Sequence, residues 1–170
     1  MSGSGKSTLA SYLETLFDSK NMKVRVLDGD DIRGEDTDKL GFGYDDVLKN
    51  NLRIAYLCQE IRDQYDAIVV PVISPYSDIR MKVRLILKPN FHLVYLKTDI
   101  SSLRDRDTKG LYSAADKGLI NDLVGYSKVN PYQAPVNEDI IIETGKNIHV
   151  ENSRKELFDY VNKSILLKTS

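Results

Sequence analysis

The residues at the start of the chain have the composition and spacing of a phosphate-binding loop. Gly5, Lys6 and Ser7 fill the last three places of the motif G-x-x-x-x-G-K-[ST]. The backbone N–H groups of such a loop surround an anion, and the positive end of the helix that follows attracts it. The sequence therefore predicts a binding site for a nucleoside triphosphate, made by Gly3, Ser4, Gly5, Lys6, Ser7 and Thr8.

Two side chains of this loop have expected chemical roles. Lys6 would reach the β- and γ-phosphates, and the Ser7 hydroxyl would hold Mg²⁺. The alternative is a flexible Gly/Ser terminus that contains a lysine by chance. Apolar residues at helical spacing (Leu9, Leu13 and Leu16) favour the loop, because its mechanism requires a helix at this point. The first glycine of the motif and the strand that delivers the loop would precede Met1, so we expect that strand to be absent from the sequence.

Three further segments carry groups suited to phosphoryl transfer. Asp28-Gly29-Asp30 could supply a base for a substrate hydroxyl and a metal or water contact, although the same residues also favour a turn. Ile73-Ser74-Pro75-Tyr76 could present Ser74 to a substrate, or could simply end a strand at a proline. Residues 104–128 are rich in charge and glycine, which suits either a mobile lid over ATP or a solvated surface segment.

The elements that must position these groups alternate between strand and helix patterns. Strands are expected at 24–27, 67–73, 91–96 and 139–142, and helices after the loop, at 45–65, at 78–87 and at the C-terminal end. Such alternation predicts an α/β fold with a parallel sheet of the P-loop NTPase type, covered by helices on both faces. Ligands of such sheets bind beyond the carboxyl ends of the strands, where the three segments lie.

Composition limits the organisation and the classes of partner. A chain of 170 residues suits one kinase domain, with the lid at about 104–128. The net charge of −1 does not indicate a surface that binds nucleic acid or a membrane. The expected partners are therefore small molecules. The single cysteine, Cys58, has no disulfide partner and lies in an apolar helical pattern, which indicates a cytoplasmic protein.

The ordered motifs resemble the adenylylsulfate (APS) kinase family over essentially the whole chain. The matches, in the family's order, are S-G-S-G-K-S-T at 2–8, D-G-D-x-[IV]-R at 28–33, L-G-F at 40–42, Asn50, I-S-P-Y at 73–76, R-D-x-K-G-L-Y at 106–112 and P-Y-x-x-P at 131–135. This resemblance implies transfer of the γ-phosphate of ATP, with Mg²⁺, to the ribose 3′-hydroxyl of a nucleoside 5′-phosphosulfate. It also implies a homodimer.

The resemblance assigns roles to individual residues. Asp30 is similar to the base that accepts the 3′-hydroxyl proton, and Lys6 to the catalytic lysine of the loop. Arg106 resembles a lid residue near ATP. The residues that resemble acceptor contacts are Asp28, Arg33, Phe42, Asn50, Ile73, Ser74, Lys109 and Leu111, with Phe42 stacking on the acceptor base.

Three positions depart from the family pattern around the acceptor. Val47 and Ser77 stand where the family usually has arginine, and Leu123 stands where a second aromatic usually covers the acceptor base. A lost guanidinium contact to an anion costs roughly 1.5–3 kcal/mol, and a lost stacking face costs on the order of 1–3 kcal/mol. These departures resemble the cytidine diphosphoramidate kinase branch of the family, which serves capsule phosphoramidate synthesis.

Three functions remain open from the sequence. The first is a 3′-kinase for a cytidine-type acceptor, and the second is an authentic APS kinase with replaced contacts. The third is a nucleotide-binding protein without turnover, supported by the strand that is absent before Met1. Retention of Lys6, Ser7, Asp28 and Asp30 argues against the third function, because a binder needs no base.

Overall fold

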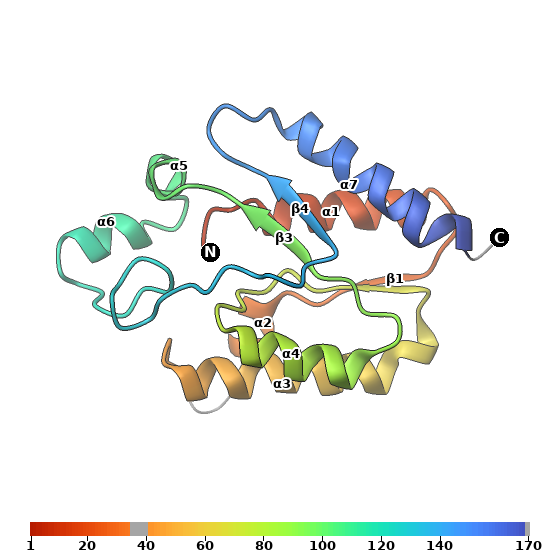
Figure 1. The fold of residues 1–170 in the computed structure, drawn as a ribbon, viewed down its shortest axis with the longest axis horizontal. Coiled ribbons are helices and arrows are strands. Elements are labelled where there is room, and N and C mark those ends of the chain that lie inside the picture. Colours follow the sequence, from red (N-terminus) through yellow and green to blue (C-terminus); the bar gives the residue numbers. More distant parts are fainter. Residues whose placement is uncertain (35–40, 169–170) are drawn as a thin grey trace.

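The computed structural model describes residues 1–34 and 41–168, and the fold is shown in Figure 1. Its strands are β1 (Val24–Val26), β2 (Ala67–Val69), β3 (Val94–Lys97) and β4 (Ile140–Glu143). Its α-helices are α1 (Lys6–Asp18), α2 (Gly29–Gly34), α3 (Tyr44–Ile61), α4 (Ser77–Leu87), α5 (Ile100–Arg106), α6 (Leu111–Asp116) and α7 (Val150–Ser164). Two short 3₁₀ turns, Arg62–Gln64 and Leu166–Lys168, follow α3 and α7.

The strands pair in parallel, as the alternation of strand and helix patterns predicts. β1 pairs with β2 through the register Val24↔Ala67, and β3 pairs with β4 through Val94↔Ile140. The apolar run that predicts a strand over 67–73 forms a ladder only at Ala67–Val69, because β1 turns away into α2. The predicted α/β class and the parallel pairing are confirmed.

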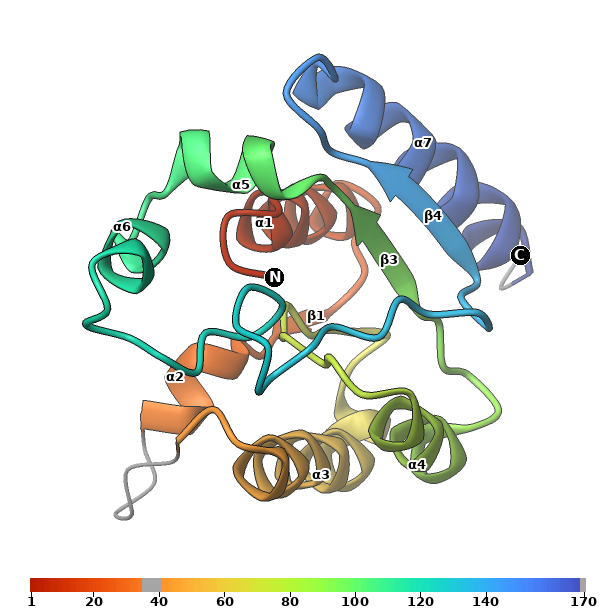
Figure 2. The ribbon, with the colours of Figure 1, turned by 60° about the vertical axis from the view of Figure 1, so that its left-hand side comes forward.

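Helices cover both faces of the strands, as Figure 2 shows. Leu9 and Phe17 of α1 pack with Leu157 and Val161 of α7 in one core cluster, together with Ile142 of β4. On the other face, a second cluster joins α2 and α3 to the alternate side chains of β2; its buried members are Leu27, Ile32, Ile54 and Cys58. Cys58, which the sequence places in an apolar helical pattern, is a free cysteine buried in this cluster.

The segment predicted as a lid contains two short helices and an irregular return. Leu103 of α5 and Tyr112 of α6 are buried with Leu123 in a core cluster of their own. Met1 packs against this cluster, so the lid begins directly over the phosphate-binding loop. Within residues 1–34 and 41–168, no helix has the length and apolar character to cross a membrane.

Candidate active site

The phosphate-binding loop has the backbone shape that its glycines predict. Gly3 and Gly5 have φ values of 73° and 91°, a left-handed conformation that other residues adopt only under strain. Gly5 caps α1, which begins at Lys6, so the helix N-terminus opens into the concave face of the loop. Ser7 lies in the first turn of α1 and is exposed. This geometry provides backbone N–H donors and a helix dipole for a phosphate group.

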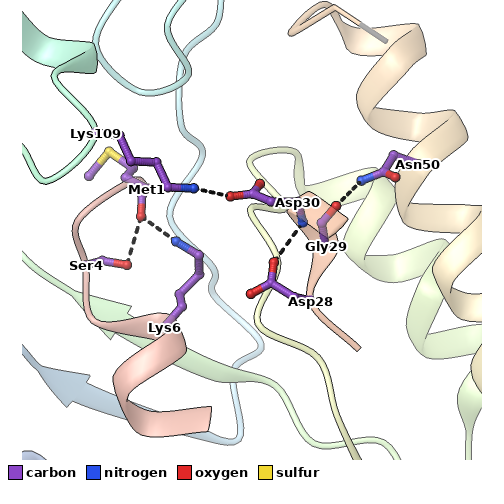
Figure 3. Close-up of polar contacts among 8 residues, drawn as sticks. All are labelled: Met1, Ser4, Lys6, Asp28, Gly29, Asp30, Asn50 and Lys109. Carbon is purple, nitrogen blue, oxygen red and sulfur yellow. Dashed lines mark hydrogen bonds and ion pairs between the residues drawn. The ribbon is translucent and has the colours of Figure 1, made fainter. Parts of the chain in front are cut away.

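Lys6 is bonded to the backbone of its own loop. Its Nζ donates to the carbonyl oxygen of Met1 at 2.7 Å, and Ser4 Oγ donates to the same oxygen at 2.9 Å (Figure 3). Burial lowers the pKa of the Lys6 ammonium, while the carboxylates of Asp30 and Asp28 act in the opposite direction. A partly desolvated cation held beside a helix N-terminus attracts phosphate more strongly than a solvated one.

The Asp28-Gly29-Asp30 segment forms a turn, and this turn is compatible with the predicted role of Asp30 in a site. Asp28 Oδ1 accepts a hydrogen bond from the Asp30 N–H at 2.8 Å, and the Asp28 carbonyl accepts one from Ile32. Asp28 therefore caps α2, and this cap fixes Asp30 in the first helical turn. The Asp30 carboxylate is left to project away from β1 (Figure 3).

The lid reaches this carboxylate directly. Lys109 Nζ lies 2.6 Å from Asp30 Oδ2, and the two side chains are 58% and 61% exposed. The pairing raises the pKa of Lys109. An exposed ion pair of this kind adds little stability, so it can open when a hydroxyl group takes the place of the ammonium beside Asp30.

Arg106 connects the lid to the loop from the other side. Its guanidinium donates to the Gly3 carbonyl at 3.0 Å and also to the Thr144 carbonyl, which follows β4. In this position Arg106 holds the backbone of the phosphate-binding loop against the end of β4.

One cavity of about 390 Å³ brings most of the predicted residues together. The predicted residues that line it are Gly3, Gly5, Lys6, Ser7, Thr8, Asp28, Asp30, Ile73, Arg106 and Lys109. A slightly larger hollow of about 420 Å³ lies between α5 and α6, but it contains none of these residues. The charged pair Arg104–Asp116 lies in the larger hollow. The smaller cavity, which the predicted residues line, is therefore the candidate active site.

Other predicted acceptor residues do not line this cavity. Asn50 is buried, and its Nδ2 donates weakly to the Gly29 carbonyl at 3.5 Å. Asn50 Oδ1 and Ser74 Oγ are buried atoms without a hydrogen-bond partner. A bound ligand could supply a partner for such atoms. Ser4 is buried, Phe42 precedes α3, and Leu111 packs in the lid core; none of these three lines the cavity. The Arg33 side chain lies outside the described part of the structure.

The three departures from the family pattern have a structural reason. Val47 is buried against Tyr76 and Ile79, and Leu123 is buried in the lid core. Apolar packing therefore replaces the family's arginine and aromatic at these positions. Ser77, in contrast, is exposed at the start of α4, and its Oγ accepts from Arg80 one turn later.

Arg80 is a buried cation that sequence analysis missed. Its guanidinium donates to the Ser74 carbonyl and to the Gln133 carbonyl, each at 2.7 Å, and it is only 6% exposed. It thus ties the segment after β2 to the segment that returns from the lid. Only its place one turn after I-S-P-Y could have drawn attention to it.

We expect Arg80→Met to lower the free energy of unfolding by about 2–4 kcal/mol, because two partly buried hydrogen bonds to carbonyl groups lose their charged donor. Urea denaturation would measure this loss. Arg84→Met is the matched control, since Arg84 lies on the same helix and is more exposed. Equal stability of Arg80→Met and the wild type would contradict the proposed structural role.

The cavity also includes residues that no motif indicated. Thr144 and Ile148 line it from the segment between β4 and α7, and Val150 and Ser153 line it from the first turns of α7. Ile148 and Val150 are 38% and 39% exposed, so they give this part of the cavity an apolar surface. No pattern in the sequence marks these four residues as part of a site.

Comparisons with known proteins identify the relatives of this chain. The family model described as Adenylylsulphate kinase matches residues 1–143. An adenylyl-sulfate kinase of Bacillus pumilus (strain SAFR-032) is 35% identical over 162 residues, which are 95% of this chain and 81% of the relative. A Sorangium cellulosum (strain So ce56) protein called probable bifunctional SAT/APS kinase 2 is 36% identical over 157 residues. That match covers 92% of this chain but only 26% of the bifunctional protein.

Solved structures give the same result at the level of the fold. The Mycobacterium tuberculosis APS kinase CysC, solved in complex with AMPPNP and APS, superposes with a TM-score of 0.81 at 30% identity. The superposition covers 95% of this chain and 93% of the other. The P-loop kinase fold predicted from the motifs is therefore confirmed.

Proposed function

This chain belongs to the adenylylsulphate kinase family, and from that premise we propose that it phosphorylates the ribose 3′-hydroxyl of a nucleoside with an anionic 5′-substituent. The chain is an APS kinase-like phosphotransferase that uses ATP and acts on a hydroxyl group. The proposal adds the position of the hydroxyl and the class of acceptor. The observation that carries it is the joint lining of one cavity by Lys6 and Asp30.

The residues of the cavity divide into a donor side and an acceptor side. Gly3, Gly5 and Lys6 would bind the triphosphate, with its γ-phosphate directed toward Asp30. The exposed apolar pair Ile148 and Val150 lines the same cavity and would offer a surface for the donor base. Ile73, with Asn50 and Ser74 behind it, would bound the acceptor nucleoside.

In the reaction, Asp30 accepts the proton of the attacking hydroxyl while Lys6 stabilises charge on the transferring phosphoryl group. Lys109 leaves Asp30 when the hydroxyl arrives and then adds positive charge at the acceptor side. Arg106 keeps the loop backbone in place during transfer. Closure of the lid excludes water, which would otherwise compete with the acceptor hydroxyl.

The residues present fit a magnesium ion. The Ser7 hydroxyl and the carboxylates of Asp28 and Asp30 line the same cavity, and Mg²⁺ prefers such oxygen donors. The described residues contain no cluster of three or more His, Cys, Asp and Glu, so phosphate and water oxygens would complete the coordination. Bound there, Mg²⁺ would neutralise charge on the phosphates of ATP.

APS is the acceptor that the family comparisons favour. A second candidate, cytidine 5′-diphosphoramidate for capsule synthesis, is favoured by a specific observation: Val47 and Leu123 are buried in apolar clusters rather than available to the phosphosulfate and the adenine. A smaller base and a less negatively charged 5′-group would suit that change.

The test is ADP release by the purified protein with Mg·ATP and each of APS, cytidine 5′-diphosphoramidate, CDP and no acceptor. Turnover with APS or with the cytidine compound would support the 3′-kinase proposal and identify its acceptor. ADP release that does not depend on any acceptor, or its complete absence in a protein that binds ATP, would contradict the proposal. A homodimer and a cytoplasmic location stay predictions.

Restoring one family arginine should change the acceptor preference. We expect Ser77→Arg to raise kcat/KM for APS roughly 10–100-fold, because a guanidinium contact to an anion contributes about 1.5–3 kcal/mol. Ser77 is exposed, so the larger side chain can be accommodated at the start of α4. Ser77→Gln is the matched control of similar length without charge. An equal effect of both substitutions, or no gain with arginine, would mean that other residues bind the 5′-anion.

A further inference from the structure

The chain that leaves β2 reaches the cavity without regular backbone pairing. Residues 70–76 belong to no helix or strand, although they include Ile73, which lines the cavity. Ser74 follows, and its Oγ is a buried atom without a hydrogen-bond partner among the described residues. Backbone groups of irregular segments need partners from other parts of the chain. The wall segment, residues 73–77, must therefore be held by groups outside it.

Arg80, in the first turns of α4, supplies several of these partners. Its Nη1 donates to the Ser74 carbonyl at 2.7 Å, and its Nη2 donates to Ser77 Oγ at 2.9 Å. The same Nη2 donates to the carbonyl of Gln133 at 2.7 Å. One guanidinium thus joins two positions of the wall segment to the return segment, residues 130–133, which follows the lid.

Gln133 completes the connection from the return segment. Its N–H donates to the Pro75 carbonyl at 2.8 Å, and its Oε1 accepts from the Ser77 N–H at 2.8 Å. Arg80 in turn holds the carbonyl of Gln133, so the side chain, the N–H and the carbonyl of this residue all have partners. The guanidinium therefore fixes a residue that itself fixes the wall segment.

Asn130 ties the return segment to the lid. It is buried, its Nδ2 donates to the Asp122 carbonyl at 2.6 Å, and its own carbonyl accepts from the Gly125 N–H at 2.8 Å. The hydroxyl of Tyr76, in the wall segment, donates to Asn130 Oδ1 at 3.3 Å. The wall segment, the return segment and the lid therefore form one hydrogen-bonded unit.

The charge of Arg80 bonds to no carboxylate within the described part of the chain. Its side chain is buried, and its hydrogen bonds go to two carbonyl groups and a hydroxyl. A buried charge that bonds only to neutral groups costs free energy. What a guanidinium supplies here is geometry, because its planar fork holds several acceptors in fixed positions and the ammonium of a lysine does not.

We propose that Arg80 is a positioning residue for the acceptor: it fixes Ile73 and Ser74 where the acceptor nucleoside binds. Arg80 does not line the cavity, so it acts through these residues rather than by contact with the acceptor. The phosphate-binding loop is held by Arg106 instead, so ATP affinity should not depend on Arg80. The inference rests on the proposed function, which places the acceptor against Ile73.

The test compares the affinities for the two substrates by calorimetric titration. Mg·ATP is one titrant, and the other is whichever of APS and cytidine 5′-diphosphoramidate binds the wild type more tightly. Arg80→Met removes the guanidinium, whereas Arg80→Lys keeps the charge without the fork. Arg84→Met is the matched control, since Arg84 lies on the same helix and bonds to Asn137 and Asp139, outside the wall segment. Circular dichroism verifies that each variant is folded at the temperature of the titration.

We expect Arg80→Met to raise the Kd of the acceptor roughly 10–100-fold, because only a fraction of the molecules would then hold the wall segment in the binding arrangement. The Kd of ATP should stay within about threefold of the wild type, and Arg84→Met should change neither value. Arg80→Lys, which keeps a donor at this place, should raise the acceptor Kd at least roughly threefold. This variant decides the question if Arg80→Met does not fold.

Two results would overturn the proposal: an acceptor Kd of Arg80→Lys equal to that of the wild type, or equal increases in the Kd values of acceptor and ATP. Titration does not require turnover, so failure here is distinguishable from failure of the 3′-kinase proposal. An acceptor that binds without being phosphorylated would contradict the proposed function, while its Kd values would still decide the role of Arg80. If the wild type bound neither acceptor, the role of Arg80 would be wrong as well.

Discussion

Asp30→Asn is expected to lower kcat by roughly 10²–10⁴ while it leaves ATP affinity within a few-fold of the wild type, because it removes the base and retains the shape of the side chain. Asp28 caps α2 through the Asp30 N–H, which asparagine keeps, so the local fold should persist. Lys109 loses its ion-pair partner, but this pair is exposed and adds little stability.

The measurement is steady-state kinetics with whichever acceptor gives the fastest ADP release in the substrate panel, together with calorimetric titration of ATP. Asp31→Asn is the matched control, because Asp31 lies in the same helix, is exposed and carries the same charge. A kcat of Asp30→Asn within threefold of the control would remove Asp30 from the role of base.

Lys6→Ala is expected to lower kcat/KM for ATP by at least roughly 10²-fold. Two charge-assisted contacts to the β- and γ-phosphates would be lost, each worth about 1.5–3 kcal/mol. The protein should remain folded, since Lys6 is a partly desolvated cation that donates its hydrogen bond to the Met1 carbonyl within its own loop. The same kinetics and a nucleotide titration would measure the effect.

Lys20→Ala, an exposed lysine just after α1, is the control for a general loss of positive charge. If Lys6→Ala and Lys20→Ala had the same kcat/KM, the assignment of the phosphate-binding loop would be wrong. A lower kcat with unchanged ATP affinity would instead place the contribution of Lys6 in the transition state alone.

Much of the fold could be predicted because its signals are local. The helix after Lys6, the long helix before Ile61 and the parallel pairing all follow from apolar periodicity. The ends of the strands could not be predicted, because a strand is defined by its pairing with a neighbouring strand. Residues 70–73 have the apolar pattern of a strand, but they lie beyond the residues paired with β1, which is soon followed by α2. Pairing is a tertiary property that one segment does not encode.

The candidate site divides in the same way. Motif residues such as Lys6, Asp30 and Lys109 were found because the chemistry fixes both their type and their spacing. The sequence left a turn and a site as alternatives for the segment that begins at Asp28. In the structure the Asp28 side chain caps α2, so the turn and the candidate site occur in the same segment. Arg80 was missed because its partners are backbone carbonyls of Ser74 and Gln133, which no sequence pattern marks.

The measurement that tests the central claim most directly is the position of the new phosphate in the reaction product. The protein would be incubated with Mg·ATP and its best acceptor, and the product analysed by two-dimensional ¹H–³¹P NMR. The proposed function predicts a new phosphorus signal coupled to the ribose H3′ proton, with one ADP formed for each product molecule. Coupling to H2′, or phosphate released only to water, would contradict a 3′-kinase whose base is Asp30.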